Sequence, residues 1–185
     1  MLARFVTLTV VGLMLIAGTA FADTTGVAWG HVYVNVVSNI AVSVVTANVD
    51  LGSVQMGTFP GELTFRIDAN AEAVNIAVAT TNLYKGDDPT NPTVSPILVD
   101  LPSGVLIEPT NANPFNGGTN VAQYTTPYNY DGFLGMQTEF IAFESSQPGF
   151  FSQNVFVTSA WTQDDPEKPQ GQYSGWVCLF ASIHV

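Results

Sequence analysis

Residues 171–185 read GQYSGWVCLFASIHV, and this C-terminal stretch decides the fold class. From Tyr173 onward every second residue is apolar or small, which is the period of a β-strand with one face toward a core. The residues of this face are Tyr173, Gly175, Val177, Leu179, Ala181, Ile183 and Val185. The alternate positions include Trp176, Cys178 and Phe180. The middle of the strand is therefore apolar on both faces, as in a central strand, and we expect the chain to end inside its sheet or at its edge.

The same period of two recurs along the chain, and no helical period is apparent beyond the first 22 residues. Strands are predicted at residues 28–36, 40–44, 63–67, 74–78, 97–101, 105–107, 133–143, 155–161 and 173–185. Glycine and proline separate many of them, as at Phe59-Pro60-Gly61 and Pro102-Ser103-Gly104. Short strands at this spacing predict an all-β fold, an antiparallel β-sandwich in one domain.

The first 22 residues have the form of a signal peptide. Arg4 gives a positive start, residues 5–17 are apolar, and Ala20-Phe21-Ala22 has the small residues of a cleavage site. The apolar run is short for a helix that crosses a bilayer. We therefore expect export with cleavage after Ala22, and no membrane span in the mature chain.

The composition is acidic, with 15 Asp and Glu against 4 Lys and Arg and a formal net charge of −11. This charge disfavours binding to nucleic acid and to anionic membrane surfaces. An apolar content of 46% is too high for a disordered acidic tail. The one cysteine, Cys178, leaves no intrachain disulfide. We expect a buried thiol there, with an intermolecular bridge as the alternative.

Catalysis has little support in the sequence. The two histidines, His31 and His184, lie inside predicted strands and outside any catalytic motif. Glu139 and Glu144 are five residues apart on one predicted strand, so they should face opposite sides and cannot act as a glycosidase pair. We expect no enzyme, no cofactor and no metal site; an extracellular hydrolase is the weaker alternative.

Two groups of residues leave binding functions open. The acidic segments Asp87-Asp88 and Asp164-Asp165-Pro166-Glu167 lie in predicted loops, where clustered oxygens could bind calcium. Solvated loop charge is the simpler interpretation of both. Aromatic rings in a polar segment could stack on sugars, although loop packing is the simpler interpretation. The residues of this segment are Tyr124, Tyr128 and Tyr130.

Both ends of the mature chain resemble donor-strand-exchange pilins, the fimbrial subunits of the chaperone–usher route. The resemblance rests on the signal peptide, on the alternating run 28–36 that follows it, and on the final G-x-Y-S-G-x-V-x-L strand at residues 171–179. It implies an immunoglobulin-like sandwich without its last strand, whose groove receives first a chaperone strand and then the N-terminal extension of the next subunit. His184 replaces the family's usual penultimate aromatic residue, and the common cysteine pair is absent.

The resemblance also implies a role for each segment. The signal peptide would be residues 1–22, the N-terminal extension 23–38 and the sandwich domain 39–185. The donor strand would insert Ala28, Gly30, Val32, Val34 and Val36 into a neighbour. The groove-edge strand would present Tyr173, Gly175, Val177, Leu179, Ala181 and Ile183.

The expected function is a structural subunit of an extracellular pilus. Its partners would be copies of itself, a periplasmic chaperone and an outer-membrane usher. The alternative is a monomeric secreted β-sandwich that binds carbohydrate or another surface ligand.

Overall fold

The computed structural model describes residues 30–91 and 93–185, and the predicted signal peptide lies outside this part of the chain. Contacts along the chain divide it after Val36 into two units. The described part consists of β-strands and one short 3-10 turn, η1 at Phe115–Gly117. None of its residues belongs to a helix that is long and apolar enough to cross a bilayer. The prediction of an all-β, antiparallel fold is confirmed.

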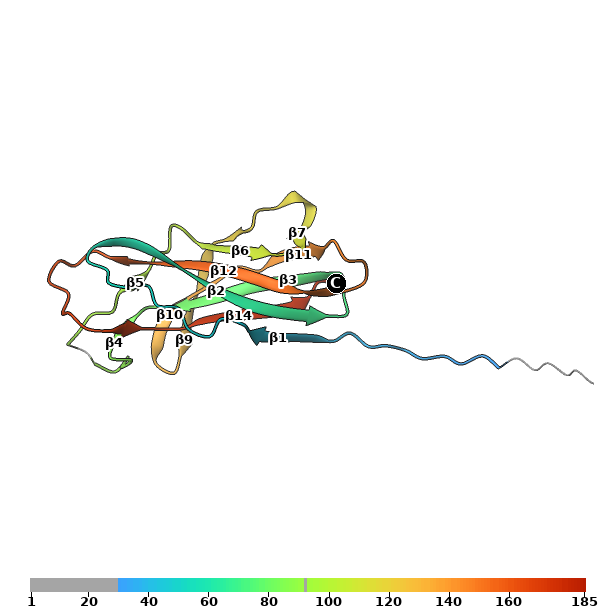
Figure 1. Ribbon diagram of the computed structural model, residues 1–185, viewed down its shortest axis with the longest axis horizontal. Coiled ribbons are helices and arrows are strands. Elements are labelled where there is room, and N and C mark those ends of the chain that lie inside the picture. The colour runs from blue at the N-terminus through green and yellow to red at the C-terminus, as the bar shows by residue number, and fades with distance from the viewer. Residues whose placement is uncertain (1–29, 92) are drawn as a thin grey trace, which may run out of the picture. The chain divides into compact units, whose positions relative to one another are not determined.

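Residues 37–185 form two large antiparallel sheets (Figure 1). The first sheet has the order β1-β2-β12-β6-β8, with β5 also paired to β12. Its strands are β1 (Ile40–Val44), β2 (Gly57–Ala69), β5 (Leu98–Val99), β6 (Val105–Pro109), β8 (Val121–Ala122) and β12 (Phe151–Gln163).

The second sheet has the order β7-β11-β3-β10-β9, and β14 pairs with the other edge of β3. Its strands are β3 (Ala73–Thr81), β7 (Ala112–Pro114), β9 (Tyr124–Tyr130), β10 (Phe133–Thr138), β11 (Ile141–Ser145) and β14 (Val177–Ile183). A small third sheet pairs β4 (Tyr84–Lys85) with β13 (Tyr173–Ser174).

The longest strands, β2 and β12, lie side by side and pair over 13 residues (Figure 1). In β12 every second residue is buried, beginning with Phe151 and continuing through Val155 and Val157. The alternate residues are partly exposed and mostly polar, such as Ser152 and Asn154. A strand with this pattern, rich in β-branched and aromatic residues, fits a sheet with one face in a core.

The inward faces of the two sheets share one hydrophobic core. Val74, Ile76 and Val78 of β3 belong to it together with Val155 and Val157 of β12, and all are completely buried. Polar contacts also join the two sheets within the interior. The Trp161 indole Nε1 donates to the carbonyl oxygen of Thr81 at 2.8 Å, and the hydroxyls of Thr80 and Ser159 are 2.9 Å apart. These buried bonds fix how the sheets align.

Pro60 corrects one predicted turn. The sequence predicts a turn at Phe59-Pro60-Gly61, but β2 runs through these residues. Pro60 lies opposite Ala160, whose carbonyl oxygen accepts from Asp100 on the far side of β12. β1 pairs only with residues 65–69 of β2, so Pro60 faces no strand on its other side. The missing N–H of proline therefore removes no ladder bond.

The final strand is shorter than the sequence predicts. Tyr173 belongs to β13, and β14 begins only at Val177. Gly175 lies between the two strands, where a Cβ would come within 2.5 Å of the carbonyl oxygen of Asn82. Any larger residue would clash there, so the position requires glycine. At this residue the chain changes its pairing partner from β4 to β3. β14 lies at an edge of its sheet, although its middle has the two apolar faces that are typical of a central strand.

The predicted strand 133–143 is also divided in two. β10 ends at Thr138 and β11 begins at Ile141, and both pair with the same edge of β3. At the break, the Thr138 hydroxyl accepts a hydrogen bond from the backbone N–H of Val78 at 3.0 Å. The side chain therefore replaces a ladder bond where the strand is interrupted.

Candidate interaction surface

The hydrophobic core is exposed to solvent along one margin, which the edge strand β1 borders. Val42 lies opposite Ile67 of β2 and Val44 lies opposite Phe65, so each valine shares the inward face of its partner. Ile67 is completely buried and Phe65 is 6% exposed. Val42 and Val44 are nevertheless 41% and 52% exposed. These side chains point toward the core, and nothing in the described part of the chain covers them fully.

The edge strand β14 shows the same property in the other sheet. Leu179 lies opposite Val78 and Ala181 lies opposite Ile76, and both partners on β3 are completely buried. Leu179 and Ala181 themselves are only half-buried. β14 and β1 approach each other across the two sheets, and each pairs with one strand only among the described residues. We call their inward-facing side chains the open edge: Ile40, Val42, Val44, Val177, Leu179, Ala181 and Ile183.

β1 and β14 also lack the protection that other edge strands carry. Natural sheets blunt their edges with charges, prolines or very short strands, because free backbone groups otherwise pair with another chain. β7 contains Pro114 and β9 contains Pro127, and β8 has only two residues. β1 and β14 contain no charged residue and no proline. They are the edges best suited to accept another strand.

Residues 30–36, which we call the arm, precede β1 and belong to no strand of the described chain. Their side chains are exposed throughout, with Val32 at 89% and Val34 at 87%. The rings of His31 and Tyr33, on alternate positions, lie 4.1 Å apart. Of the predicted donor residues, Gly30, Val32, Val34 and Val36 are therefore exposed. Ala28 lies outside the described residues.

Asn70 fixes the chain at the point where β1 begins. Its side-chain Oδ1 accepts from the N–H of Asn39 at 2.6 Å, and its Nδ2 donates to the carbonyl oxygen of Val37 at 2.8 Å. Its backbone N–H also donates to the carbonyl oxygen of Asn39 at 3.2 Å. These bonds hold residues 37–39 against the β2–β3 turn, so that the arm begins at a defined point.

The three tyrosines of the predicted sugar-binding segment do not act together. Tyr124 packs against the core, where burial raises the pKa of its hydroxyl. Tyr128 and Tyr130 lie instead on the outer face of the second sheet. The Tyr128 ring is 6.1 Å from that of Phe180, and the Tyr130 ring is 5.4 Å from that of Trp176. We call Tyr128, Tyr130, Trp176 and Phe180 the outer aromatic cluster.

Cys178 lies within this cluster and is half-buried, less covered than the sequence predicts. The Tyr128 hydroxyl donates to its sulfur at 3.6 Å. Loss of hydration, together with the neighbouring thiol, raises the pKa of Tyr128 to about 12. Tyr128 is therefore neutral near pH 7, and its hydrogen bond to the Cys178 sulfur helps to position the ring.

The remaining residues considered for catalysis are dispersed. His184 contacts Asn75 through Nδ1 and Oδ1 at 2.9 Å, and His31 lies exposed in the arm. Glu144 lies within β11, whereas Glu139 lies in the break before it, and both are exposed. Surface hollows of about 190 and 220 Å³ bring no group of titratable side chains together. These hollows are smaller than most small-molecule sites.

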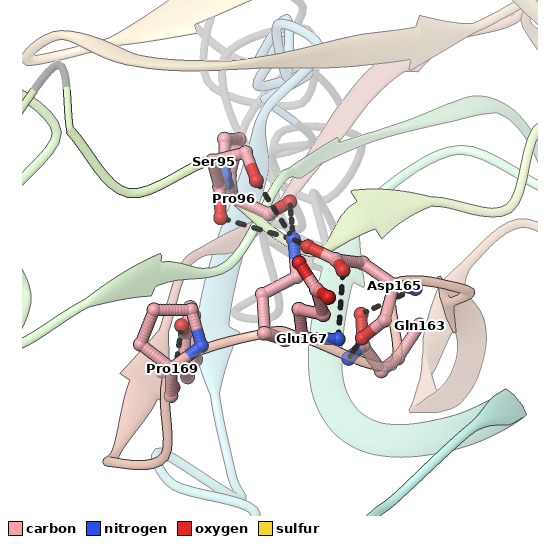
Figure 2. Close-up of polar contacts among 8 residues, drawn as sticks. Ser95, Pro96, Gln163, Asp165, Glu167 and Pro169 are labelled. Atoms are coloured by element: carbon pink, nitrogen blue, oxygen red, sulfur yellow. Dashed lines mark hydrogen bonds and ion pairs between the residues drawn. The ribbon is translucent and has the colours of Figure 1, made fainter.

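Lys168 lies in one acidic loop, and Figure 2 draws the polar contacts of this loop with Ser95 and Pro96. The Lys168 ammonium donates to the carbonyl and hydroxyl oxygens of Ser95, at 3.1 and 3.0 Å, and to the carbonyl of Pro96 at 3.1 Å. Asp165 lies 3.8 Å away, and its other carboxylate oxygen accepts from the N–H of Glu167 at 2.9 Å. The ammonium is thus held by three neutral oxygens and lies near one carboxylate. The sequence around Lys168 does not predict these contacts.

The carboxylates of the other acidic loop make local turn contacts. Asp88 accepts from the hydroxyl and the N–H of Thr90 at 2.6 and 2.9 Å, and these bonds lower the pKa of Asp88. Asp87 accepts from the Ser174 hydroxyl at 2.9 Å. Within residues 30–91 and 93–185, no three His, Cys, Asp or Glu side chains gather as metal ligands would.

The sequence predicts β14 and the arm as interaction elements, but it does not predict that β1 forms part of the open edge. A signal was present, because Ile40, Val42 and Val44 alternate on one face directly after the arm. No protein-family model matches this chain, and no curated protein matches it at a significant level. The function must therefore be inferred from the open edge and the arm themselves.

Proposed function

We propose that this chain is a structural subunit of an extracellular filament and that it polymerises by donating its N-terminal strand to a neighbouring copy. The observation that carries this proposal is the open edge, where inward-facing side chains of β1 and β14 remain exposed to solvent. An additional strand there would cover the core and pair with free backbone groups. The domain would then be an immunoglobulin-like sandwich completed by another subunit.

The arm has the properties required of that strand. Its valines are spaced by two residues, as are the inward-facing residues of β1 and β14. Burying one valine contributes about 1.5 kcal/mol or more, so three valines contribute roughly 4.5 kcal/mol or more before ordering costs. Hydrogen bonds to the free edge of β14 add to this, and an antiparallel arrangement gives the stronger ladder.

Export and assembly factors complete the proposal. Cleavage after Ala22 would place the arm near the start of the mature chain, available for donation. An unfilled open edge is an aggregation hazard. A periplasmic chaperone that fills it, and an outer-membrane usher that exchanges the strands, would protect the subunit before assembly.

The decisive experiment changes one inward-facing arm residue. In the mature full-length chain, Val34→Asp places a charge where the proposal buries a valine, so filaments should be absent by electron microscopy. Asn35→Asp adds the same charge on the opposite face of the strand and should leave filaments intact. Circular dichroism and thermal unfolding of both variants show whether the body is folded. Filaments of Val34→Asp as abundant as those of the unaltered chain would refute strand donation.

The alternative, a secreted monomer that binds carbohydrate, gives a different result in gel filtration. It requires the unaltered mature chain to elute as a monomer at all concentrations. Donation requires oligomers whose size grows with concentration and time, and which Val34→Asp abolishes.

A further inference from the structure

The outer aromatic cluster continues to the free edge of the second sheet. Trp176, directly before β14, and Phe180 of β14 are 45% and 36% exposed, and they alternate with the inward-facing Val177 and Leu179. The strand next to β14 is β3, whose outer-face Ala79 lies opposite Cys178. The residues of β3 beneath the cluster include the small Ala77 and Ala79, which are completely buried. The aromatic surface therefore ends exactly where a further strand would be added.

Gly135 of β10 shows how closely this surface is packed. It lies between Tyr128 of β9 and Thr81 of β3 in the sheet. A Cβ at Gly135 would lie 2.1 Å from the carbonyl oxygen of Thr80. Without a side chain here, the Tyr128 ring can extend across the sheet toward Phe180 and Cys178. Tyr128 of β9 thus contacts residues of β14 across the two intervening strands, β10 and β3.

A strand that pairs with β14 must present its two faces alternately to the core and to this outer surface. If Val32 and Val34 of the arm enter the core, His31 and Tyr33 necessarily project on the outer side. The inference rests on the proposed strand donation and adds a second contact to it. We propose that the outer aromatic cluster is the docking surface for His31 and Tyr33 of a second copy of this chain.

The geometry of cross-strand pairs supports this occupant. Side chains directly opposite on neighbouring strands have Cβ atoms about 5 Å apart, and diagonal neighbours are about 7–8 Å apart. Both separations are within reach of aromatic rings. The His31 and Tyr33 rings are exposed and 4.1 Å apart, so they can contact the cluster together. Phe180 is the cluster member on the pairing strand itself, and Trp176 lies directly before that strand.

The test is a double-mutant cycle in filaments of the mature full-length chain. Its variants are Tyr33→Ser in the arm, Phe180→Ser in the cluster, and both together. The measurement is the rate at which subunits leave the filament in guanidinium chloride, followed by gel filtration. An aromatic pair supplies about a 2- to 10-fold effect, so each single change should speed release by about that factor. The double variant should be no faster than the faster single variant.

Controls separate this inference from strand donation itself. Phe156→Ser makes the same change on the outer face of the first sheet, where Phe156 is half-buried. Its effect on the rate of subunit release should multiply with that of Tyr33→Ser, because the two side chains do not interact. If Tyr33→Ser and Phe180→Ser also combine multiplicatively, or if either leaves release unchanged, the docking surface is refuted while donation stands. If Val34→Asp still forms filaments, the proposed function fails first.

Discussion

Shortening Leu179 to alanine should destabilise the monomer only moderately and the filament strongly. Leu179 points toward the core from β14 but is half-buried. Replacing a fully buried leucine by alanine costs about 2–5 kcal/mol. With half of the side chain already in solvent, the isolated subunit should lose about half of this, roughly 1–2.5 kcal/mol. Once a donated strand covers Leu179, the full cost applies.

The difference between the two states is the measurable quantity. The cost that appears only in the filament, again roughly 1–2.5 kcal/mol, corresponds to subunit release that is about 5- to 70-fold faster. The monomer is measured by guanidinium unfolding in the Val34→Asp background, which should not polymerise. The filament is measured by release of subunits from chains with an unaltered arm.

Val157→Ala is the matched control, because Val157 is completely buried in the same core. It should destabilise the body of the subunit and leave release from the filament unchanged. The reasoning is refuted if Leu179→Ala costs the monomer as much as a fully buried site does and does not affect release. That result would mean that the margin of the core beside β14 is already closed.

Three further predictions concern the subunit body. Gly135→Ala should lower the free energy of unfolding by about 3 kcal/mol or more in urea titrations, because its Cβ would overlap the carbonyl of Thr80. Lys168→Met removes three hydrogen bonds, so amide exchange at residues 93–97 should become faster, while Lys85→Met leaves it unchanged. Hydrogen bonds from its arginine and serine neighbours lower the pKa of Asp68. These hydrogen bonds stabilise the folded state above about pH 4, and this stabilisation is lost below that pH as Asp68 is protonated. Asp68→Asn should therefore reduce the drop in melting temperature between neutral and acidic pH.

Much of the fold could be predicted because period-two alternation reflects burial on one face of a sheet. Residues 40–44 form β1 as predicted, and residues 155–161 lie within β12. The errors came where tertiary context decides. Pro60 is typical of a turn. It can lie within β2 because β1 pairs only with residues 65–69, so no strand on that side needs a hydrogen bond from the Pro60 backbone nitrogen. Gly175 interrupts the final strand because of Asn82, which is distant in the sequence.

The candidate site was predictable only in part, for a related reason. Alternation identifies Leu179 or Val42 as inward-facing, but exposure depends on whether another strand covers that margin. Alternation in the sequence shows which face of a strand points inward, but not whether a further strand covers that face. The two apolar faces of β14 are typical of a central strand, and its position at an edge is the observation on which the proposed pairing with the arm depends. The role of Lys168 had no local signal, because Ser95 and Pro96 are more than 70 residues away.

The ammonium group of Lys168 has a consequence for the conditions in which the protein works. Loops of exported proteins are often organised by calcium, and their order then varies with the calcium concentration of the medium. Here the positive charge in the loop is covalently attached to the chain. Chelators cannot remove it, and dilution cannot weaken it. The order of this loop should therefore be the same in calcium-free buffer as in hard water.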